Sequence, residues 1–480
     1  MIGTNDLIFG IRAGFSYFYV KTKEMQETTR EIFLAVNTYK NGLYEAQLWD
    51  FSEDQNPEKV MEDLDNCLPN TIIMAKNFNW FISDKDDFDK GIVSALQSKE
   101  ESFSSTENRK VLIIVSDADF SNAIPKPLQK SFIEIDFPLP DKEQRKAVLD
   151  FFVDSLKDNE KFKSPNESTK DKIIENAAGL TRAAMEKALS FSVLKSNGEI
   201  VPDQIFDLRK QEIEKIQGIK IGRYTQKLSD ILGNDSAKEL ITSIVDHPDS
   251  KGFILVGPPG TGKSHLIKAI AAEYGAIVFE AELANMMGSG LVGQAEQAVK
   301  EFCDLIIANP GCFVIFDEIE KGLPKKSQSG SDVAERSMSQ ILKLLSDRPV
   351  PFKAFATSNN VSSLPPEWLR AGRWDTAPIC VDLPDEGEKK EILNHYKKQM
   401  NVKGDLVNMD GWSGAEIKEV CELARKTKKS INEVEKWIVP ISKTMKEDID
   451  AFRKWADGRT IPATIKKSVV RSKSNRSVNL

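Results

Sequence analysis

A glycine-rich stretch, GPPGTGKS at residues 257–264, follows four apolar residues at 253–256. Its glycines let the main chain wrap closely around an anion, so that backbone N–H groups converge on phosphate oxygens. Lys263 adds a positive charge for the β- and γ-phosphates, and the Ser264 hydroxyl is a ligand type that suits Mg²⁺. A chance glycine-rich turn is disfavoured, because strand, motif and a helix over 266–274 agree. The stretch predicts a phosphate loop that binds ATP with Mg²⁺.

Two further apolar runs end in polar residues that suit phosphoryl transfer. The run 312–316 leads into Asp317 and Glu318, and the run 353–357 leads to Asn359. We expect Asp317 to hold Mg²⁺ through water, Glu318 to polarise the attacking water and Asn359 to orient that water. The alternatives are a surface acidic pair and a turn asparagine. The order of the three runs favours the catalytic interpretation.

The segment after Asn359 resembles a known family. LPPEWLRAGRWD at 364–375, followed by VDLP at 381–384, resembles the second region of homology of AAA-type ATPases. In that family two arginines of this segment reach the active site of the neighbouring subunit, and Arg370 and Arg373 occupy those positions. The resemblance implies a ring, expected to be hexameric, in which an arginine in trans is worth about 10³ to 10⁵ in rate. Two solvated arginines on a loop are the alternative.

The same resemblance implies which residues surround the nucleotide. Asp230, Ile231, Leu232 and Gly233 match the loop at the adenine edge, and Ile392 and Tyr396 match positions that pack on adenine. Gly414 and Ala415 match the start of a lid helix in its small-residue version, without a sensor arginine. The remaining expected nucleotide contacts lie along the phosphate loop: Pro258, Pro259, Gly260, Thr261, Gly262 and His265.

The expected central-pore loop departs from the family pattern. The family usually carries an aromatic residue before Val-Gly, but here Met286 and Met287 precede GSGLVG at 288–293. Methionine and leucine still grip apolar side chains, so the loop predicts weak threading or simple holding of a partner. Burial of both methionines in a core is the alternative. A second pore-facing candidate is the segment 325–330, for which a solvated turn is the alternative.

The first half of the chain repeats the pattern of the second half without its chemistry. The segments 124–141, 178–184 and 72–75 echo 364–385, 411–415 and the strand before Asp317, at offsets of 241 to 244 residues where the motifs align. An internal duplication explains matches at one period. Yet residues 21–24 contain no glycine, and Lys76 and Asn77 stand where the acidic pair stands later. We expect this half not to hydrolyse ATP.

A degenerate unit followed by an active one resembles the tandem AAA family encoded by algal plastids and cyanobacteria. The fold class expected is α/β, with a P-loop NTPase core of the AAA+ type and a helical lid, preceded by a degenerate AAA-like α/β domain. The expected domains are a degenerate α/β domain at 1–150, its helical lid at 151–203, a linker helix at 204–225, the active α/β subdomain at 226–385, a helical lid with C-terminal helices at 386–465 and a basic disordered tail at 466–480.

Composition restricts the class of protein further. Lys and Arg total 66 against 73 Asp and Glu, a net charge of −7, which gives no general field for nucleic acid. Five scattered cysteines and three histidines predict neither disulfides nor a metal cluster. No segment is long and apolar enough for a membrane helix. We expect a soluble protein of the cytoplasm or plastid stroma.

These patterns together predict an ATP-hydrolysing ring that remodels a protein partner. A nucleotide-gated assembly or binding module is one rival, which the non-aromatic pore loop favours. A motor associated with nucleic acid is another rival, and only the five basic residues of 466–480 support it. A solubilising tail is the simpler interpretation of that segment.

Overall fold

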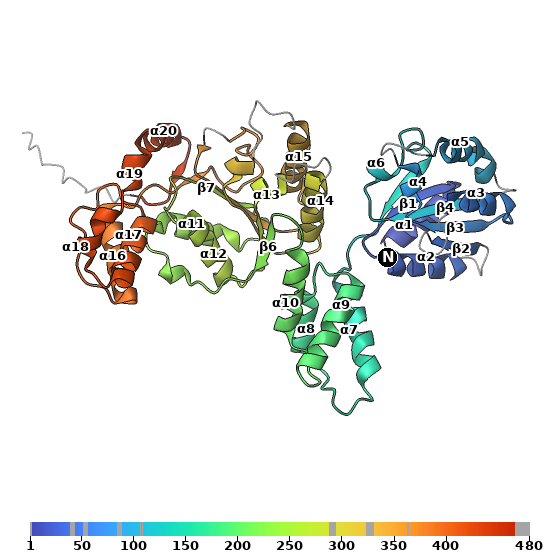
Figure 1. Cartoon of the computed structure of the whole chain (residues 1–480), viewed down its shortest axis with the longest axis horizontal. Coiled ribbons are helices and arrows are strands. Elements are labelled where there is room, and N and C mark those ends of the chain that lie inside the picture. Colours follow the sequence, from blue (N-terminus) through green and yellow to red (C-terminus); the bar gives the residue numbers. More distant parts are fainter. Residues whose placement is uncertain are drawn as a thin grey trace, which may run out of the picture. The chain divides into compact units, whose positions relative to one another are not determined.

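The computed structural model divides the chain into two compact units, Met1–Arg209 and Lys210–Leu480. It describes residues 2–38, 44–50, 56–83, 89–105, 107, 109–287, 294–322, 331–361 and 364–465. Figure 1 shows in each unit a sheet flanked by helices. The predicted α/β fold class, an AAA-like core preceded by a degenerate α/β domain, is confirmed.

The first unit contains a parallel sheet with the strand order β2-β3-β4-β1-β5. Its central strands are buried along nearly their whole length. Successive side chains enter two different cores, Tyr17 and Tyr19 one, Phe18 and Val20 the other. This alternation is what a sheet covered by helices on both faces requires. The strands are β1 (Tyr17–Lys21), β2 (Glu45–Asp50), β3 (Thr71–Lys76), β4 (Lys110–Ser116) and β5 (Phe132–Asp136).

Helices cover both faces of this sheet. The first two pack on one face, and the next four pack on the other. These helices are α1 (Ile2–Ala13), α2 (Met25–Thr38), α3 (Pro57–Asn66), α4 (Asn79–Ile82), α5 (Lys90–Ser104) and α6 (Phe120–Ala123). A separate helical group with its own apolar core follows, made of α7 (Lys142–Leu156), α8 (Glu167–Asn176), α9 (Arg182–Lys195) and α10 (Pro202–Ile213).

The second unit contains a larger sheet with the strand order β12-β11-β7-β10-β9-β8-β6. All its pairs are parallel except β6 with β8. Its strands are β6 (Ile219–Gly222), β7 (Gly252–Val256), β8 (Val278–Ala281), β9 (Phe313–Phe316), β10 (Lys353–Ser358), β11 (Ile379–Cys380) and β12 (Ile461–Pro462). Strands β11-β7-β10-β9-β8 repeat the order β5-β1-β4-β3-β2 of the first unit.

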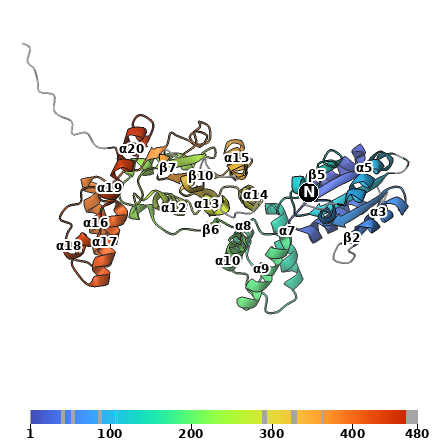
Figure 2. The same cartoon turned by 45° about the horizontal axis from the view of Figure 1, so that its top comes forward.

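Helices surround this second sheet and continue into a lid. Those in the layers of the sheet are η2 (Leu228–Asp230), α11 (Asp235–Val245), α12 (Lys263–Glu273), α13 (Leu283–Met287), α14 (Gln294–Ile307), η3 (Ile319–Gly322) and α15 (Ser331–Asp347). Figure 2 shows the lid helices gathered beside the sheet. The lid and C-terminal helices are α16 (Glu386–Met400), α17 (Gly414–Thr427), α18 (Ile431–Val434), η5 (Glu435–Trp437), α19 (Ile441–Thr444) and α20 (Lys446–Ala456).

The helix between the two halves is shorter than the sequence predicts. A linker helix over 204–225 was expected, but α10 ends at Ile213 and residues 219–222 form β6 instead. Gly218 adopts a left-handed conformation at φ 78°, and β6 then pairs with β8. The strand pairing is a long-range contact that local helical spacing does not reveal. The other predicted domain boundaries stay predictions.

Candidate nucleotide site

The phosphate loop joins β7 to α12 through a turn that only glycine accommodates at two positions. A side chain at Gly257 would lie 2.0 Å from the carbonyl oxygen of Val381, and one at Gly260 would lie 2.9 Å from Ser413 Oγ. Gly260 also has φ 76°, in the left-handed region. The loop therefore packs directly against the segment after β11 and the start of the lid helix α17. Its N–H groups precede a helix of 11 residues, which suits an anion.

Lys263 is the first residue of α12 and is almost fully buried. Its Nζ donates to the carbonyl oxygens of Gly257 and Pro258, each at 2.8 Å. Burial lowers the pKa of Lys263 to about 8, while the carboxylates of Glu320, Asp317 and Glu318 act in the opposite direction. The amine thus lies against the loop with a weakened hold on its proton, and an anion beside it would favour the charged form.

Ser264 and Asp317 form a pair of oxygen ligands at the carboxyl end of the sheet. Ser264 Oγ donates to Asp317 Oδ1 at 2.7 Å, and Thr357 Oγ1 donates to the same oxygen. Thr357 Oγ1 in turn accepts the backbone N–H of Glu318 at 2.9 Å. A hydroxyl beside a carboxylate fits Mg²⁺, which prefers few protein ligands and completes its shell with phosphate and water. No group of three metal-binding His, Cys, Asp or Glu occurs in the described part of the chain.

Glu318 and Asn359 meet, as the predicted catalytic pair would require. Glu318 has a left-handed backbone at φ 49°, and its Oε1 accepts a hydrogen bond of 2.7 Å from Asn359 Nδ2. The other carboxylate oxygen accepts from Lys321 Nζ. Glu320 Oε1 accepts the N–H of Asn359 at 3.1 Å, while its buried Oε2 has no partner among the described residues. Hydrogen bonds from Asn359 to Glu318 and Glu320 thereby join the ends of β9 and β10.

The sequence prediction missed three of these polar residues. Thr357, Glu320 and Lys321 contact the predicted residues directly. Thr357 ends an apolar run, and this polar ending was a usable signal. The roles of Glu320 and Lys321 depend on how η3 turns after β9, which the sequence pattern does not specify.

The predicted adenine-edge residues fall into two groups. Leu232 packs with Ile392 and Tyr396 in the core of the lid, whereas Ile231 lies in the core between the sheet and α11 and α12. The lid also reaches the phosphate loop, because the N–H of Ala415 donates to the carbonyl oxygen of Gly260 at 3.1 Å. The structure thus brings Leu232, Ile392 and Tyr396 together.

The other predicted contacts lie around this group. Gly233 packs against Glu388, which accepts the N–H of Asn234 at 3.2 Å. Asp230 closes the short helix η2. His265 is exposed on α12, and partial desolvation of its ring lowers its pKa. The remaining loop residues flank Gly260 in the chain: Pro258 and Thr261, which are buried, and Pro259 and Gly262, which are partly exposed. A side chain at Gly414 would lie 3.7 Å from the carbonyl oxygen of Gly260.

The predicted trans arginines lie on a segment fixed to the start of β7. The N–H of Asp375 donates to Gly252 O at 3.0 Å, and Arg373 Nε donates to Ser346 Oγ at 3.0 Å. Arg370 is exposed. The phosphate loop begins after the other end of this strand, about 16 Å away at the rise of a parallel strand. Arg373 is therefore anchored far from the phosphate loop of its own chain.

The expected pore loop is only partly described. Met286 is fully buried and packs against Gly218, so the core alternative is confirmed for this residue. Residues 288–293 and 325–330 lie outside the described residues. The gripping role expected for the methionines is thereby reduced to Met287, which is partly exposed.

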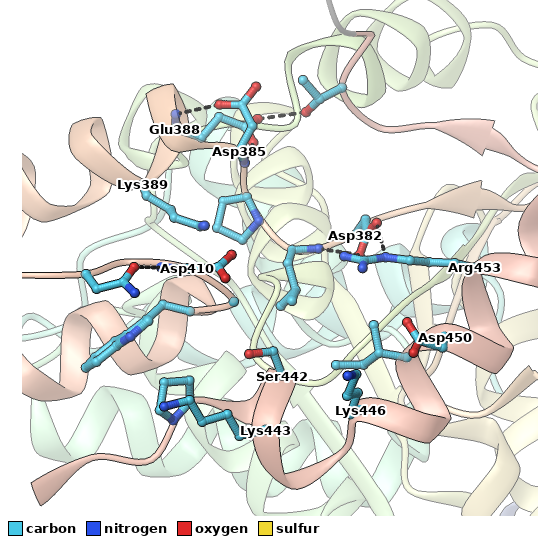
Figure 3. A pocket seen from close by; sticks show the side chains of 18 of the residues that line it. Asp382, Asp385, Glu388, Lys389, Asp410, Ser442, Lys443, Lys446, Asp450 and Arg453 are labelled. Atoms are coloured by element: carbon cyan, nitrogen blue, oxygen red, sulfur yellow. Dashed lines mark hydrogen bonds and ion pairs between the residues drawn. The ribbon is translucent and has the colours of Figure 1, made fainter. Parts of the chain in front are cut away.

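A cavity of about 1140 Å³ lies between the lid, the segment after β11 and α20. Figure 3 shows Asp382 paired with Arg453, whose Nε and Nη2 donate at 2.9 and 3.1 Å. At the start of α16, Glu388 Oε1 accepts from the hydroxyl of Thr464 at 2.7 Å. None of the phosphate-loop residues lines this cavity.

In the first unit, side chains of the chain itself occupy the corresponding places. The residues after β1 are Thr22, Lys23 and Glu24, and Glu24 Oε1 accepts the backbone N–H of Arg182 at the start of α9. Burial raises the pKa of Glu24. Lys76 at the end of β3 pairs with Asp50 at 3.1 Å. Asn77 has a left-handed φ of 55°, similar to the φ of 49° at Glu318. The backbone shape is kept where the acidic pair is replaced.

The fold and the site together define an AAA domain. Residues 253–378 match the family model described as "ATPase family associated with various cellular activities (AAA)". This range holds the phosphate loop, the acidic pair and the arginine segment. The second unit thus contains a domain of the AAA family.

The likeness to plastid proteins extends over most of the chain. AAA domain-containing protein ycf46 of Guillardia theta is 25% identical, covering 94% of each chain, and that of Pyropia yezoensis is 25% identical, covering 96% of this chain and 99% of that one. A proteasome-activating nucleotidase of Saccharolobus islandicus is 36% identical over 36% of this chain and 46% of its own length. No described helix is long and apolar enough to cross a membrane.

Proposed function

We propose that this protein hydrolyses ATP with Mg²⁺ at the site of its second unit. The observation that carries the proposal is the convergence of Ser264, Asp317, Glu318 and Asn359 at the ends of three neighbouring strands beside the phosphate loop. Phosphoryl transfer needs little covalent help from a protein and depends on positioning and charge stabilisation. This site supplies both.

Each residue takes a defined part in the reaction. Lys263 neutralises the β- and γ-phosphates, and Ser264 and Asp317 would hold Mg²⁺, which would supply further charge neutralisation there. Glu318 polarises a water held by Asn359. The water oxygen bonds to the γ-phosphorus, the bond from that phosphorus to the bridging oxygen of ADP breaks, and the water proton passes towards the Glu318 carboxylate.

We further propose that the site is completed in a ring of identical chains, of six subunits as the resemblance implies. The anchoring of Arg373 at the start of β7 supports action on a neighbour, because its own phosphate loop is at the other end of that strand. The free energy released by ATP hydrolysis would drive remodelling of a protein partner. A cytoplasmic or stromal location is part of the same proposal, supported by the plastid relatives.

The test is Glu318→Gln in the full chain. The amide keeps the hydrogen-bonding shape but cannot accept the proton, so ATP should bind and the ring should assemble while phosphate release stops. Phosphate release, nucleotide affinity and particle size measure the three properties. Glu391→Gln, an exposed residue of α16, is the matched control and should resemble the parent. Parent-like turnover of Glu318→Gln would refute the role of Glu318.

A nucleotide-gated binding module is the second candidate, favoured by the burial of Met286 and the absence of an aromatic residue in 286–293. In that case ATP sets assembly and hydrolysis resets it. Leu291→Ala should abolish unfolding of a partner and leave ATPase unchanged if the chain threads polypeptide. Unchanged partner handling would favour the module. Deleting 466–480, which lies outside the described residues, tests the nucleic-acid alternative through loss of salt-sensitive binding.

A further inference from the structure

Arg348 joins three segments that are distant in sequence. It follows α15 directly and has φ 42°, a left-handed conformation that is unfavourable for any residue with a side chain. Its Nε donates to Leu345 O at 3.1 Å and Nη1 to Phe352 O at 2.8 Å. Its Nη2 donates to Lys251 O at 2.7 Å and to Arg373 O at 3.1 Å. One guanidinium thus ties the end of α15, the start of β7 and the arginine segment together.

The surroundings of Arg348 hold it charged and in place. Burial lowers its pKa to about 10, and the nearby carboxylate of Asp375 acts in the opposite direction, so the guanidinium stays cationic at neutral pH. Asp375 itself accepts from Ser250 Oγ at 2.7 Å and from the N–H of Gly252 at 2.9 Å. A planar cation with five donors is suited to collect several carbonyl oxygens at once.

The contact with Arg373 bears on the direction of that side chain. Arg348 holds the carbonyl oxygen of Arg373, and Ser346, two residues before Arg348, accepts from Arg373 Nε at 3.0 Å. Lys251 Nζ adds a bond of 2.8 Å to the carbonyl oxygen of Gly372. The main chain of Arg373 is therefore held by the residues around the end of α15 and just before β7. Its side chain is held by Ser346 and by the carbonyl oxygen of Glu367, to which Nη1 donates.

We propose that Arg348 is a positioning residue that aims Arg373 at the active site of the neighbouring subunit. The inference rests on the proposed trans action of Arg373 and goes beyond it by assigning the residue that sets its place. The proposal predicts an effect on the adjacent subunit. Loss of Arg348 impairs hydrolysis at the active site of the adjacent subunit and leaves the active site of its own subunit competent.

The experiment uses full-length chains carrying Arg348→Gln, alone and mixed with Glu318→Gln chains. Alone, Arg348→Gln should lower kcat by about 10²-fold, the effect of a misplacement of about 1 Å, with little change in KM for ATP. In mixed rings turnover should return, because a Glu318→Gln subunit still offers an intact Arg373 to the competent site of an Arg348→Gln subunit. A folding defect would not be rescued in this way.

Three further variants separate the possible outcomes. Arg373→Gln mixed with Glu318→Gln should regain turnover if the arginine acts in trans, and no recovery would refute the proposed trans action itself. Recovery with Arg373→Gln but not with Arg348→Gln would overturn the role of Arg348 alone. Arg348→Lys should lose less activity and show the same rescue, and it decides the question if Arg348→Gln does not fold, because parent-like kcat would then refute the role. Arg425→Gln, exposed on α17, is the control.

Discussion

The two units share one strand order and differ in what stands at the strand ends. In the second unit Asp317 and Glu318 follow β9 and are bridged by Thr357, and Ser264 at the start of α12 donates to Asp317. In the first unit Lys76 ends β3, the strand that corresponds to β9, and Asn77 follows it. The carboxylate of Glu24 accepts the N–H of Arg182 at the start of α9. The shared strand order therefore sets where side chains lie, and a small set of side chains at the strand ends determines the chemistry.

The contacts at the start of the two lid helices, α17 and α9, differ in a similar way. In the second unit a backbone N–H, that of Ala415, meets the phosphate loop at Gly260. In the first unit the N–H of Arg182 meets a carboxylate of the chain, and the Arg182 guanidinium pairs with Glu31 at 3.2 Å. A carboxylate at a helix N-terminus is an anion in a favourable place. The first unit thus places a side-chain carboxylate of its own where the second unit has the carbonyl oxygen of Gly260.

The largest expected effect after loss of Glu318 comes from Thr357→Val. The substitution keeps the shape but removes the hydroxyl that bridges Asp317 and the backbone of Glu318, so kcat should fall about 10- to 100-fold, as for other residues that orient ligands. Steady-state ATPase measures it. Thr357→Ser keeps the hydroxyl and serves as the control. Equal activity of both variants would show that the bridge is unimportant.

A smaller effect is proton uptake when ATP binds. In the free protein Lys263 has a pKa of about 8, below its ordinary 10.5, so about half of it is neutral at pH 8. The phosphates favour the charged form, and binding at pH 8 should take up about half a proton, whereas binding at pH 6.5 should take up almost none from this group. His265 has a lowered pKa and is already neutral at pH 8.

Calorimetry in buffers of different ionisation heat measures this uptake. The lowered pKa of free Lys263 also makes the free energy of folding depend on pH. Because its folded pKa is lowered, the cost of burying the charge is present below pH 8 and disappears as pH rises towards 10.5. A binding heat independent of buffer at pH 8 would contradict the buried environment of Lys263.

The smallest effect concerns Glu24 in the first unit. Its folded pKa is raised above 4.5, mainly by burial, so the neutral form is favoured by folding. The contribution to stability is then full below pH 4.5 and is lost as pH rises through the folded pKa. Glu24→Gln should remove this dependence, and Glu160→Gln, which is exposed, should not. Thermal unfolding across pH measures it, and an unchanged profile in Glu24→Gln would contradict the burial.

The sequence predicted the elements that carry chemistry better than the contacts between them. The apolar runs before Asp317 and Asn359 are β9 and β10, because buried parallel strands are apolar along their whole length. Offsets of 241 to 244 residues between the aligned motifs indicated the repeated strand order. Local sequence patterns were sufficient to predict both features.

Contacts that depend on register were not predictable in this way. Thr357 meets Asp317 because Ala356 pairs with Phe316 across two strands that are forty residues apart in sequence. Arg348 reaches Lys251 and Arg373 only once the sheet has formed. Met286, expected as a possible grip, is buried against Gly218 through the pairing of β6 with β8. Each depends on long-range geometry that local patterns do not encode.

The most direct test of the account is the number of ATP molecules bound per chain. Glu318→Gln, which should hold ATP without turnover, is saturated with ATP and Mg²⁺, and the bound nucleotide is counted against protein; the same count is made with Lys263→Ala. The account predicts one ATP per chain for Glu318→Gln and none for Lys263→Ala, because the first unit has no phosphate loop. Two per chain, or one retained in Lys263→Ala, would contradict it.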